Sequence, residues 1–335
     1  MEGVGVSVGV SRAFVTGAYG LLGTWLVRAL LERGDHVVVL RRDEPAASAL
    51  VLEGLEERCD VVTGDVRDSE TMERALGDYE VDTVFHLAAQ TLVGTARRSP
   101  VPTFEANVRG TWILLDACRR LEVPRVVVAA SDKAYGAHDE LPYRESFALE
   151  PRYPYDVSKA ATDLIARSYF HTYGVPVAVT RFANLYGGGD LNFSRLVPEA
   201  AAAAIQGRAP VIRSDGTPER DFLFVEDAVR AYLDIAGALD GADGSAAGEA
   251  FNAGGGQPHS VLEVVDLVCR AAGTQVEPDV RGQGTPEGEI DRQYVDASKL
   301  RALTGWEPRV SLQDGLGRTV EWYRAHRDVL PQVAS

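Results

Sequence analysis

The feature that most constrains the fold is a glycine-rich turn between a short apolar run and a helical pattern. Residues 12–16 (RAFVT) form the apolar run, glycines follow at 17, 20 and 23, and a helical pattern extends from Thr24 to Arg33 before Gly34. A strand, a glycine turn and a helix in this order present bare helix N–H groups that a pyrophosphate can approach closely. The turn predicts a dinucleotide site with these candidate residues: Gly17, Tyr19, Gly20, Leu21 and Leu22.

Further β-branched runs alternate with helical patterns through the first half of the chain. The runs are 36–40, 59–62, 81–87, 125–130 and 175–180, and the helical patterns are 69–76, 103–121 and 154–173. Their apolar residues are continuous rather than alternating, which indicates a parallel sheet covered by helices on both faces. We therefore predict an α/β protein built on a Rossmann-type, doubly wound parallel sheet.

The chain length of 335 residues predicts about two domains. Beyond about Asn184 the pattern loosens into loops, with helical patterns at 196–207, 261–271 and 297–303. We expect residues 1–11 to be a frayed extension and 12–184 to form the NAD(P)-binding domain, with parts of 210–260 returning to it. Residues 185–330 are expected to form a smaller, mostly α/β substrate-binding domain.

The charge balance restricts the partners of the protein. Lys and Arg number 34 against 49 Asp and Glu, a formal net charge of -15. Such an acidic surface repels phosphate backbones and anionic lipid, so we expect no nucleic acid or membrane partner, and an anionic ligand must be held locally. No run reaches the roughly 18 apolar residues of a membrane span. The three separated cysteines indicate a cytoplasmic protein with reduced thiols and no metal site.

The end of the second predicted strand bears on the choice between NAD and NADP. An acid usually bonds the adenosine ribose of NAD at this place. Here Arg41 and Arg42 stand there instead, and paired arginines suit a 2′-phosphate, which favours NADP; Asp43 leaves NAD open. Asp65 and Val66 follow the third strand, and Asp65 either reaches the adenine or caps the next helix.

Tyr155 and Lys159 lie four residues apart, on one face of a helix that begins at Pro154. A tyrosine becomes a usable base when a nearby ammonium and an oxidised nicotinamide stabilise its phenolate. Ser131 follows a predicted strand, at the carboxyl edge where parallel sheets bind ligands. Ser131, Tyr155 and Lys159 therefore form a candidate hydride-transfer site.

These motifs, with several others, resemble the extended short-chain dehydrogenases/reductases that modify nucleotide sugars. The resemblance spans nearly the whole chain and rests on residues 16–23 (TGAYGLLG), 86–90 (HLAAQ), 107–111 (NVRGT), 155–159 (YDVSK), 181–187 (RFANLYG), 220–227 (RDFLFVED) and 305–308 (GWEP). It implies an NAD(P) cofactor, a nucleotide-diphosphate sugar as substrate, and a homodimer formed by the helices at 103–121 and 155–173.

The resemblance also implies roles for individual residues. Those expected at the cofactor, besides the glycine turn, are Arg41, Arg42, Asp65, Val66, Leu87, Ala88, Ala89, Gln90, Asn107, Tyr155 and Lys159. Those expected at the sugar or its phosphates are Gln90, Ser131, Asp132, Asn184, Arg195, Arg220 and Arg281. Arg220 matches the pyrophosphate-binding arginine of the family, and a bidentate guanidinium suits that role.

The tripeptide Ser131-Asp132-Lys133 distinguishes reactions within this family. Epimerases usually carry small residues here, and the thymidine-linked glucose dehydratases carry Thr-Asp-Glu. Asp-Lys is similar to the CDP-glucose 4,6-dehydratases and to the inverting UDP-N-acetylglucosamine dehydratases. Residues 86–93 (HLAAQTLV) and 187–190 (GGGD) are most similar to the CDP-glucose enzymes.

The resemblance thus implies a 4,6-dehydratase in which Tyr155 takes the 4-hydroxyl proton, Lys133 removes the C5 proton and Asp132 protonates the departing 6-hydroxyl. A lysine base must be neutral, which requires burial or a cationic neighbour; a Lys133 that only holds an anion stays an alternative. A C4 epimerase needs only Ser131, Tyr155 and Lys159, and an NADPH-dependent ketoreductase would consume its cofactor, so both also stay open. A non-catalytic dinucleotide sensor would not need the tyrosine and lysine.

Overall fold

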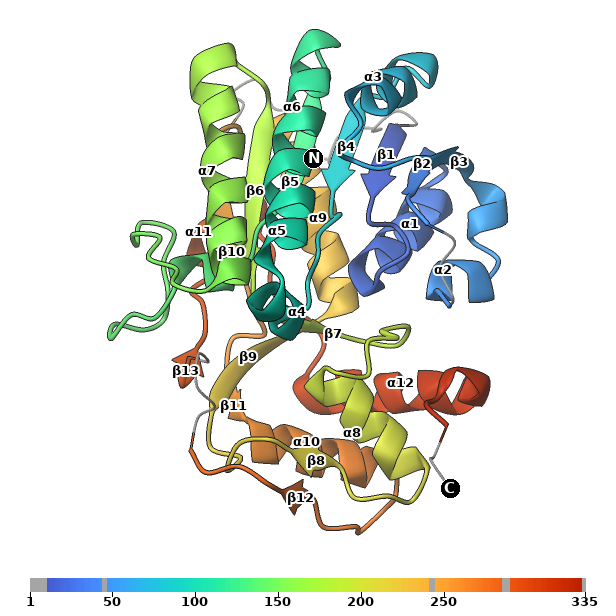
Figure 1. Ribbon diagram of the computed structural model, residues 1–335, viewed down its shortest axis with the longest axis vertical. Helices are drawn as coiled ribbons and strands as arrows, with labels where there is room; N and C mark the ends of the chain where they lie inside the picture. Colours follow the sequence, from blue (N-terminus) through green and yellow to red (C-terminus); the bar gives the residue numbers. More distant parts are fainter. Residues whose placement is uncertain (1–10, 44–46, 241–244, 285–289, 333–335) are drawn as a thin grey trace, which may run out of the picture.

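A computed structural model describes residues 11–43, 47–240, 245–284 and 290–332 of the chain (Figure 1). Most of the expected N-terminal extension therefore lies outside the described residues. The larger part of the fold is a seven-stranded sheet whose neighbouring strands all pair in parallel. This sheet, with helices on both faces, confirms the predicted doubly wound α/β fold.

The order of strands across the sheet shows how it is wound. In that order the strands are β10 (Ala250–Ala253), β6 (Val177–Phe182), β5 (Arg125–Ala129), β4 (Thr83–His86), β1 (Arg12–Thr16), β2 (His36–Arg41) and β3 (Asp60–Thr63). Six of them coincide with the predicted apolar runs, with ends displaced by one or two residues. The seventh, β10, was not predicted as a strand and joins the sheet at the free edge of β6.

Helices cover both faces of this sheet. On one face lie α1 (Leu21–Arg33) and α9 (Val225–Leu239), and on the other α3 (Ser69–Asp78), α6 (Gly110–Arg120) and α7 (Pro154–Tyr173). Within β2, Val37 and Val39 face α1 and α9, whereas Val38 faces the helices on the other side of the sheet. This double burial explains why the strand sequences are continuously apolar.

The prediction of one regular helix over 103–121 was wrong in its middle. The segment is α5 (Pro100–Phe104), then the π-helical turn η2 (Glu105–Arg109), then α6. A π-turn holds one more residue than an α-turn and occurs frequently at functional sites. The turn carries Asn107, which is almost fully buried.

The smaller region lies below the large sheet in Figure 1 and is organised around β9 (Glu219–Phe224). This strand pairs in parallel with β7 (Asn184–Tyr186) and β13 (Arg292–Gln293), and antiparallel with β11 (Pro258–Ser260). An apolar cluster joins it to α8 (Leu196–Ile205), α10 (Val261–Ala271) and α12 (Leu312–Ala325). The remaining elements are short: α2 (Ala49–Leu52), η1 (Glu56–Arg58), α4 (Val93–Arg98), η3 (Asp132–Tyr135), β8 (Val211–Ile212), β12 (Asp279–Val280), α11 (Ser298–Thr304) and η4 (Arg327–Val329).

Three elements beyond residue 184, α9, β10 and α11, pack with the large sheet, while the division of the chain into domains stays a prediction. Among the described residues, no helix is long and apolar enough to cross a bilayer. The same residues contain no group of three or more His, Cys, Asp or Glu side chains arranged to hold a metal. Cys59, Cys118 and Cys269 are free thiols.

Candidate active site

The glycine turn connects β1 to α1 and lies directly against the end of β4. Gly17 has a φ of +75°, and a Cβ atom built there would lie 2.7 Å from the backbone nitrogen of Ala88. A Cβ on Gly23 would lie 2.2 Å from the carbonyl oxygen of Gly17. Gly20 is the N-cap of α1, and no side chain caps the helix there. The first N–H groups of α1 are therefore uncovered by side chains, which suits a pyrophosphate.

Two residues predicted at the glycine turn and the third strand have buried side chains. Leu21 packs in the core of the smaller region and Val66 packs beneath Gly110 on α6. Leu22 is partly buried against the same core as Leu21. Leu21 and Val66 therefore offer a ligand mainly their backbone atoms.

The ends of β2 and β3 present paired charges rather than open arginines. Arg41 lies 3.4 Å from a carboxylate oxygen of Glu56, and Arg42 lies 2.5 Å from Asp43. Glu56 also accepts a hydrogen bond from the hydroxyl of Tyr19. Each predicted 2′-phosphate ligand thus has a carboxylate beside it.

Asp65 does not cap the helix that follows β3. Its carboxylate pairs with Arg67 at 2.8 Å, and this hydrogen bonding holds the pKa of Asp65 below its usual range. The N-cap of α3 is Asp68, whose side chain accepts a hydrogen bond from the backbone nitrogen of Glu70 at 3.1 Å. The capping alternative for Asp65 is therefore wrong, while its contact with adenine stays a prediction.

A buried polar network lies where β1 and β4 end. The Nδ1 atom of His86 is 2.8 Å from the hydroxyl of Thr16, and its Nε2 atom is 3.1 Å from the hydroxyl of Thr111. Burial, assisted by the charge of Lys159, lowers the pKa of His86 to about 3, so the ring is neutral. The Thr16 hydroxyl also accepts from the nitrogen of Ala88 at 3.2 Å, which fixes the turn that leads to the predicted residues Leu87, Ala89 and Gln90.

Asn107 joins three elements of the site through its side-chain amide. Its Oδ1 atom accepts from the nitrogen of Gln90 at 2.7 Å, and its Nδ2 atom donates to the carbonyl oxygen of Gln90 at 3.1 Å. The same nitrogen donates to the hydroxyl of Ser158 at 2.9 Å, and that hydroxyl donates to the carbonyl oxygen of Tyr155 at 2.6 Å. The π-turn therefore ties the end of β4 to the first turn of α7. The Oε1 atom of Gln90 is buried without a hydrogen-bond partner in the described structure.

Tyr155 and Lys159 occupy successive turns of α7, as predicted from their spacing. The Lys159 ammonium donates to the carbonyl oxygen of Ala129, at the end of β5, over 2.8 Å, and burial lowers its pKa to about 8. Burial raises the pKa of Tyr155 to about 12, an effect opposed by the charge of Arg195 and a hydrogen bond with Ser131. The structure thus brings Ser131, Tyr155, Lys159 and Arg195 together.

The tripeptide that follows β5 forms its own small cap. The Ser131 hydroxyl accepts from the backbone nitrogen of Lys133 at 3.2 Å and donates to Oδ1 of Asp132 at 3.0 Å. Asp132 is 2% exposed, and its Oδ2 atom has no hydrogen-bond partner among the described residues. Burial raises the pKa of Asp132, which favours the protonated carboxyl that can donate a proton. The amine of Lys133 donates to Oε1 of Gln293 over 3.0 Å.

Sequence reasoning did not single out Asp156, Asp221 or Gln293, and the structure places all three at the site. Burial raises the pKa of Asp156 to about 6, and the charges of Lys133 and Asp132 act on this carboxyl. Burial also raises the pKa of Asp221 to about 7, although Oδ1 of this residue accepts from the nitrogen of Gly255 at 2.7 Å. Adjacency to Tyr155 and Arg220 was the available signal for the two acids. For Gln293, 160 residues from Lys133, the sequence offered none.

Of the four predicted substrate ligands beyond residue 183, three approach the site and one does not. Arg220 on β9 is 8% exposed and donates to the carbonyl oxygen of Asp291 at 2.9 Å. Its charge opposes the rise that burial causes in the pKa of Asp132. Arg195 pairs with Asp190 at 3.0 Å and donates to Thr91 at 3.2 Å.

On β7, Asn184 donates to the carbonyl oxygen of Asp221 at 3.3 Å. Arg281 instead follows β12, at the bottom of Figure 1, where its largely exposed guanidinium pairs with Asp279 at 2.7 Å. The structure thus does not bring Arg281 to the catalytic residues.

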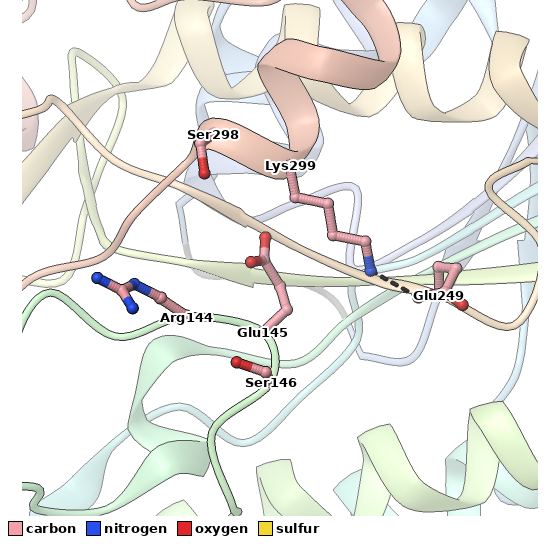
Figure 2. A pocket seen from close by; sticks show the side chains of 6 residues that line it. All are labelled: Arg144, Glu145, Ser146, Glu249, Ser298 and Lys299. Atoms are coloured by element: carbon pink, nitrogen blue, oxygen red, sulfur yellow. Dashed lines mark hydrogen bonds and ion pairs between the residues drawn. The ribbon is translucent and has the colours of Figure 1, made fainter.

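Figure 2 shows a different cavity, of about 410 Å³, lined by Arg144, Glu145, Ser146, Glu249, Ser298 and Lys299. None of the candidate catalytic residues lines it. Lys299 pairs with Glu249 at 2.6 Å, and Glu145 accepts from the backbone nitrogen of Asn252 at 2.8 Å. The charged groups that line this cavity are thus paired with one another or with the backbone, and the cavity is separate from the site described above.

Comparison with known proteins agrees with this geometry. The sequence profile of the family described as GDP-mannose 4,6 dehydratase matches residues 14–319. A dTDP-glucose 4,6-dehydratase of Xanthomonas campestris is 34% identical over 332 residues, covering 92% of this chain and 92% of that protein.

Two solved structures are also similar. The dTDP-glucose 4,6-dehydratase of Streptomyces venezuelae, solved with NAD bound, has a TM-score of 0.85 at 33% identity and covers 95% of this chain and 98% of its own. The UDP-glucose 4-epimerase of Thermotoga maritima, solved with UDP-glucose, has a TM-score of 0.86 at 29% identity, with coverages of 94% and 99%. The chain therefore belongs to the GDP-mannose 4,6-dehydratase family, within the extended short-chain dehydrogenases/reductases, and is an NAD(P)-dependent nucleotide-sugar dehydratase or epimerase.

Proposed function

We propose that this protein is a nucleotide-sugar 4,6-dehydratase, which converts an NDP-hexose into the NDP-4-keto-6-deoxyhexose with loss of water. The observation that carries the proposal is the Asp132-Lys133 pair. It adds a buried carboxyl with an unpaired oxygen, and a lysine amine, to the Ser131, Tyr155 and Lys159 set. Epimerisation at C4 requires that set alone, so the extra acid and base point to elimination.

We propose NAD rather than NADP as the cofactor. Arg41 and Arg42, which favoured NADP from the sequence, lie beside Glu56 and Asp43, and these carboxylates oppose a 2′-phosphate. The glycine turn and the uncovered N–H groups of α1 fit a dinucleotide pyrophosphate. When bound, the nicotinamide supplies the acceptor and later the donor of one hydride. Mass determination of the copurified dinucleotide tests this choice.

In the first half of the reaction, Tyr155 accepts the proton of the sugar 4-hydroxyl while C4 loses its hydride and becomes a ketone. Lys159 favours the phenolate electrostatically, since its ammonium lies one turn further along α7 and is anchored to Ala129. We infer that Ser131, next to Tyr155, orients the sugar 4-hydroxyl.

In the second half, the ketone acidifies the C5 hydrogen, and Lys133 accepts that proton. The C6–O bond then breaks, and Asp132 donates a proton to the departing hydroxyl, which leaves as water. Burial of Asp132 supports this role, because the raised pKa favours the protonated carboxyl. When the hydride returns to C6, Lys133 returns a proton to C5, and the atoms balance as the loss of one water.

We infer that the substrate diphosphate is bound by Arg220 and Arg195. The chain has a formal net charge of -15, so a dianionic nucleotide sugar requires a local concentration of positive charge. Arg220 is nearly buried on β9 and Arg195 lies close enough to influence Tyr155. For the base we propose a CDP-glucose-like substrate from the Asp132-Lys133 motif, with dTDP-glucose as the second candidate because curated relatives bear that name.

We also infer a homodimer formed through α6 and α7, which lie side by side in Figure 1. Three large apolar side chains of these helices are exposed: Trp112 at 42%, Leu164 at 56% and Tyr173 at 58%. An exposed apolar patch of this kind marks an interaction surface. Light scattering coupled to size exclusion should give twice the monomer mass of 36.1 kDa.

The reaction is tested by incubating the purified protein with CDP-, dTDP-, UDP- and GDP-hexoses without added reductant and following the sugar by NMR. We expect a 4-keto-6-deoxy product, with cytidine or thymidine as the preferred base. Inversion at C4 with the 6-hydroxyl retained would establish an epimerase instead. Consumption of added NADPH with a ketosugar would establish a ketoreductase.

A further inference from the structure

Gln293 connects the smaller region directly to the candidate base. It lies on β13, opposite Arg220 on β9, and its side chain is fully buried. Its Oε1 atom accepts the hydrogen bond from the amine of Lys133 at 3.0 Å. Within the described parts of the chain this is the only hydrogen bond of the Lys133 amine, so Gln293 sets the direction of that amine.

The other end of the Gln293 amide is unsatisfied. Its Nε2 atom is shielded from solvent and has no hydrogen-bond partner in the described residues, and the same is true of Oδ2 of Asp132. Leaving a buried polar group unpaired is energetically unfavourable. A hydroxyl oxygen accepts hydrogen bonds, so a ligand hydroxyl satisfies an unpaired amide donor such as Nε2 of Gln293.

We propose that Gln293 positions Lys133 for proton removal and that its amide nitrogen donates a hydrogen bond to a hydroxyl oxygen of the hexose. The proposal rests on the dehydratase function proposed above. A neutral amine has two N–H bonds and one lone pair. When one N–H donates to Oε1 of Gln293, the lone pair points away from Gln293 and is free to accept a proton. An amide oxygen is an uncharged acceptor, whereas a carboxylate at this place would stabilise the ammonium and hinder its use as a base.

Two variants of equal length separate positioning from structure. Gln293→Met removes both hydrogen bonds, and Gln293→Glu keeps an acceptor but adds a charge. C4 oxidation is followed by nicotinamide absorbance and C5 proton removal by deuterium incorporation. At saturating substrate we expect Gln293→Met to slow C5 exchange by at least about tenfold, with C4 oxidation changed less than about threefold and KM raised. Gln293→Glu should also slow C5 exchange, because the added carboxylate joins those of Asp132 and Asp156 around the Lys133 amine.

The matched control is Gln206→Met, since Gln206 is a partly buried amide that donates to the carbonyl oxygen of Pro331 at 2.8 Å, away from the site. It should leave both steps unchanged. If Gln293→Met slows C4 oxidation and C5 exchange in parallel, together with a fall in thermal stability, Gln293 only pins β13 to η3 and the proposal is overturned.

A second readout does not depend on turnover. The chain has three lysines, Lys133, Lys159 and Lys299, so trace acetylation followed by mass spectrometry can compare Lys133 with Lys299 as internal reference. We expect Gln293→Glu to slow labelling of Lys133 at pH 8 and Gln293→Met to speed it. Unchanged labelling in both variants overturns the positioning role. If the wild-type protein makes no 4-keto-6-deoxy sugar, the dehydratase proposal fails separately, and the labelling alone decides whether Gln293 controls Lys133.

Discussion

The two sides of the active site differ in how their polar atoms are satisfied. On the cofactor side, His86, Asn107, Ser158 and Lys159 bond neighbouring hydroxyls, one another or the backbone, although Oε1 of the adjoining Gln90 has no partner in the described structure. On the sugar side, Asp132, Asp221 and Gln293 each keep one buried atom without a partner in the described structure.

This difference indicates where each kind of work is done. A network that satisfies itself holds its geometry whether or not a ligand is present, which suits a cofactor that stays bound through a reaction without net redox change. Unpaired buried atoms instead carry an energetic penalty that a matching ligand relieves, so they select the ligand. The following variants test this contrast, beginning with the largest expected effect.

Replacing Tyr155 by Phe should almost abolish oxidation at C4, because the variant lacks the group that accepts the 4-hydroxyl proton. We expect a loss of about 10²–10⁴-fold in nicotinamide reduction on mixing with the NDP-hexose. Tyr169→Phe is the matched control on the same helix and should stay near the wild-type rate. A Tyr155→Phe rate within tenfold of wild type would remove this residue from the mechanism.

Lys133→Ala should separate the two halves of the reaction. Oxidation at C4 should persist, and elimination should fall by about 10²-fold or more, because the C5 proton has no base. NMR should then show a 4-ketohexose that retains its 6-hydroxyl. Lys299→Ala, which removes an amine paired with Glu249, should leave both rates unchanged. An unaffected dehydration rate in Lys133→Ala contradicts the base assignment.

Asn107→Ala probes the satisfied side. It leaves the N–H and C=O of Gln90 and the hydroxyl of Ser158 without their partner. We expect a loss of about 2–4 kcal/mol in the free energy of unfolding, measured with urea. A change below about 0.5 kcal/mol, the usual size for a surface substitution, would show that the network does not preorganise this side.

Asp221→Asn tests the unsatisfied side through the pH dependence of the free energy of unfolding. Folding raises the pKa of Asp221 to about 7 from its usual 3.8, so the folded state keeps a proton that the unfolded chain releases. That contribution is complete below about pH 4 and is lost as pH rises toward 7. The variant should therefore gain roughly 1–2 kcal/mol on the wild type between pH 5 and pH 8. Parallel stability curves for the two proteins would contradict the raised pKa, and Asp279→Asn is the exposed control.

The cofactor side could be predicted from the sequence because its signals are local. The glycine spacing, the apolar strands and the interval between Tyr155 and Lys159 each lie within one short segment. The π-turn at Asn107 escaped prediction, because an α-helix and a π-turn suit the same composition. Only the backbone of the folded chain distinguishes the two.

The sugar side could be predicted only in part, because distant segments build it. The motif Ser131-Asp132-Lys133 was visible, but the partner of its lysine lies on a two-residue strand that exists only through pairing with β9. Likewise β10 has four residues and depends on the exposed edge of β6. The helices α9 and α12 were not predicted either. The first three residues of α9 belong to the motif at 220–227, which had been interpreted as a substrate-binding segment.

The insertion of β10 beside β6 has a consequence for protein engineering. The chain leaves the large sheet after β6, returns with α9 and β10, departs again for β11 and α10, and returns once more with α11. A truncation after residue 184 would remove an edge strand and uncover one face of the sheet. Substrate preference therefore cannot be transplanted from a relative at one junction, and a functional chimera needs matched splice sites at each crossing.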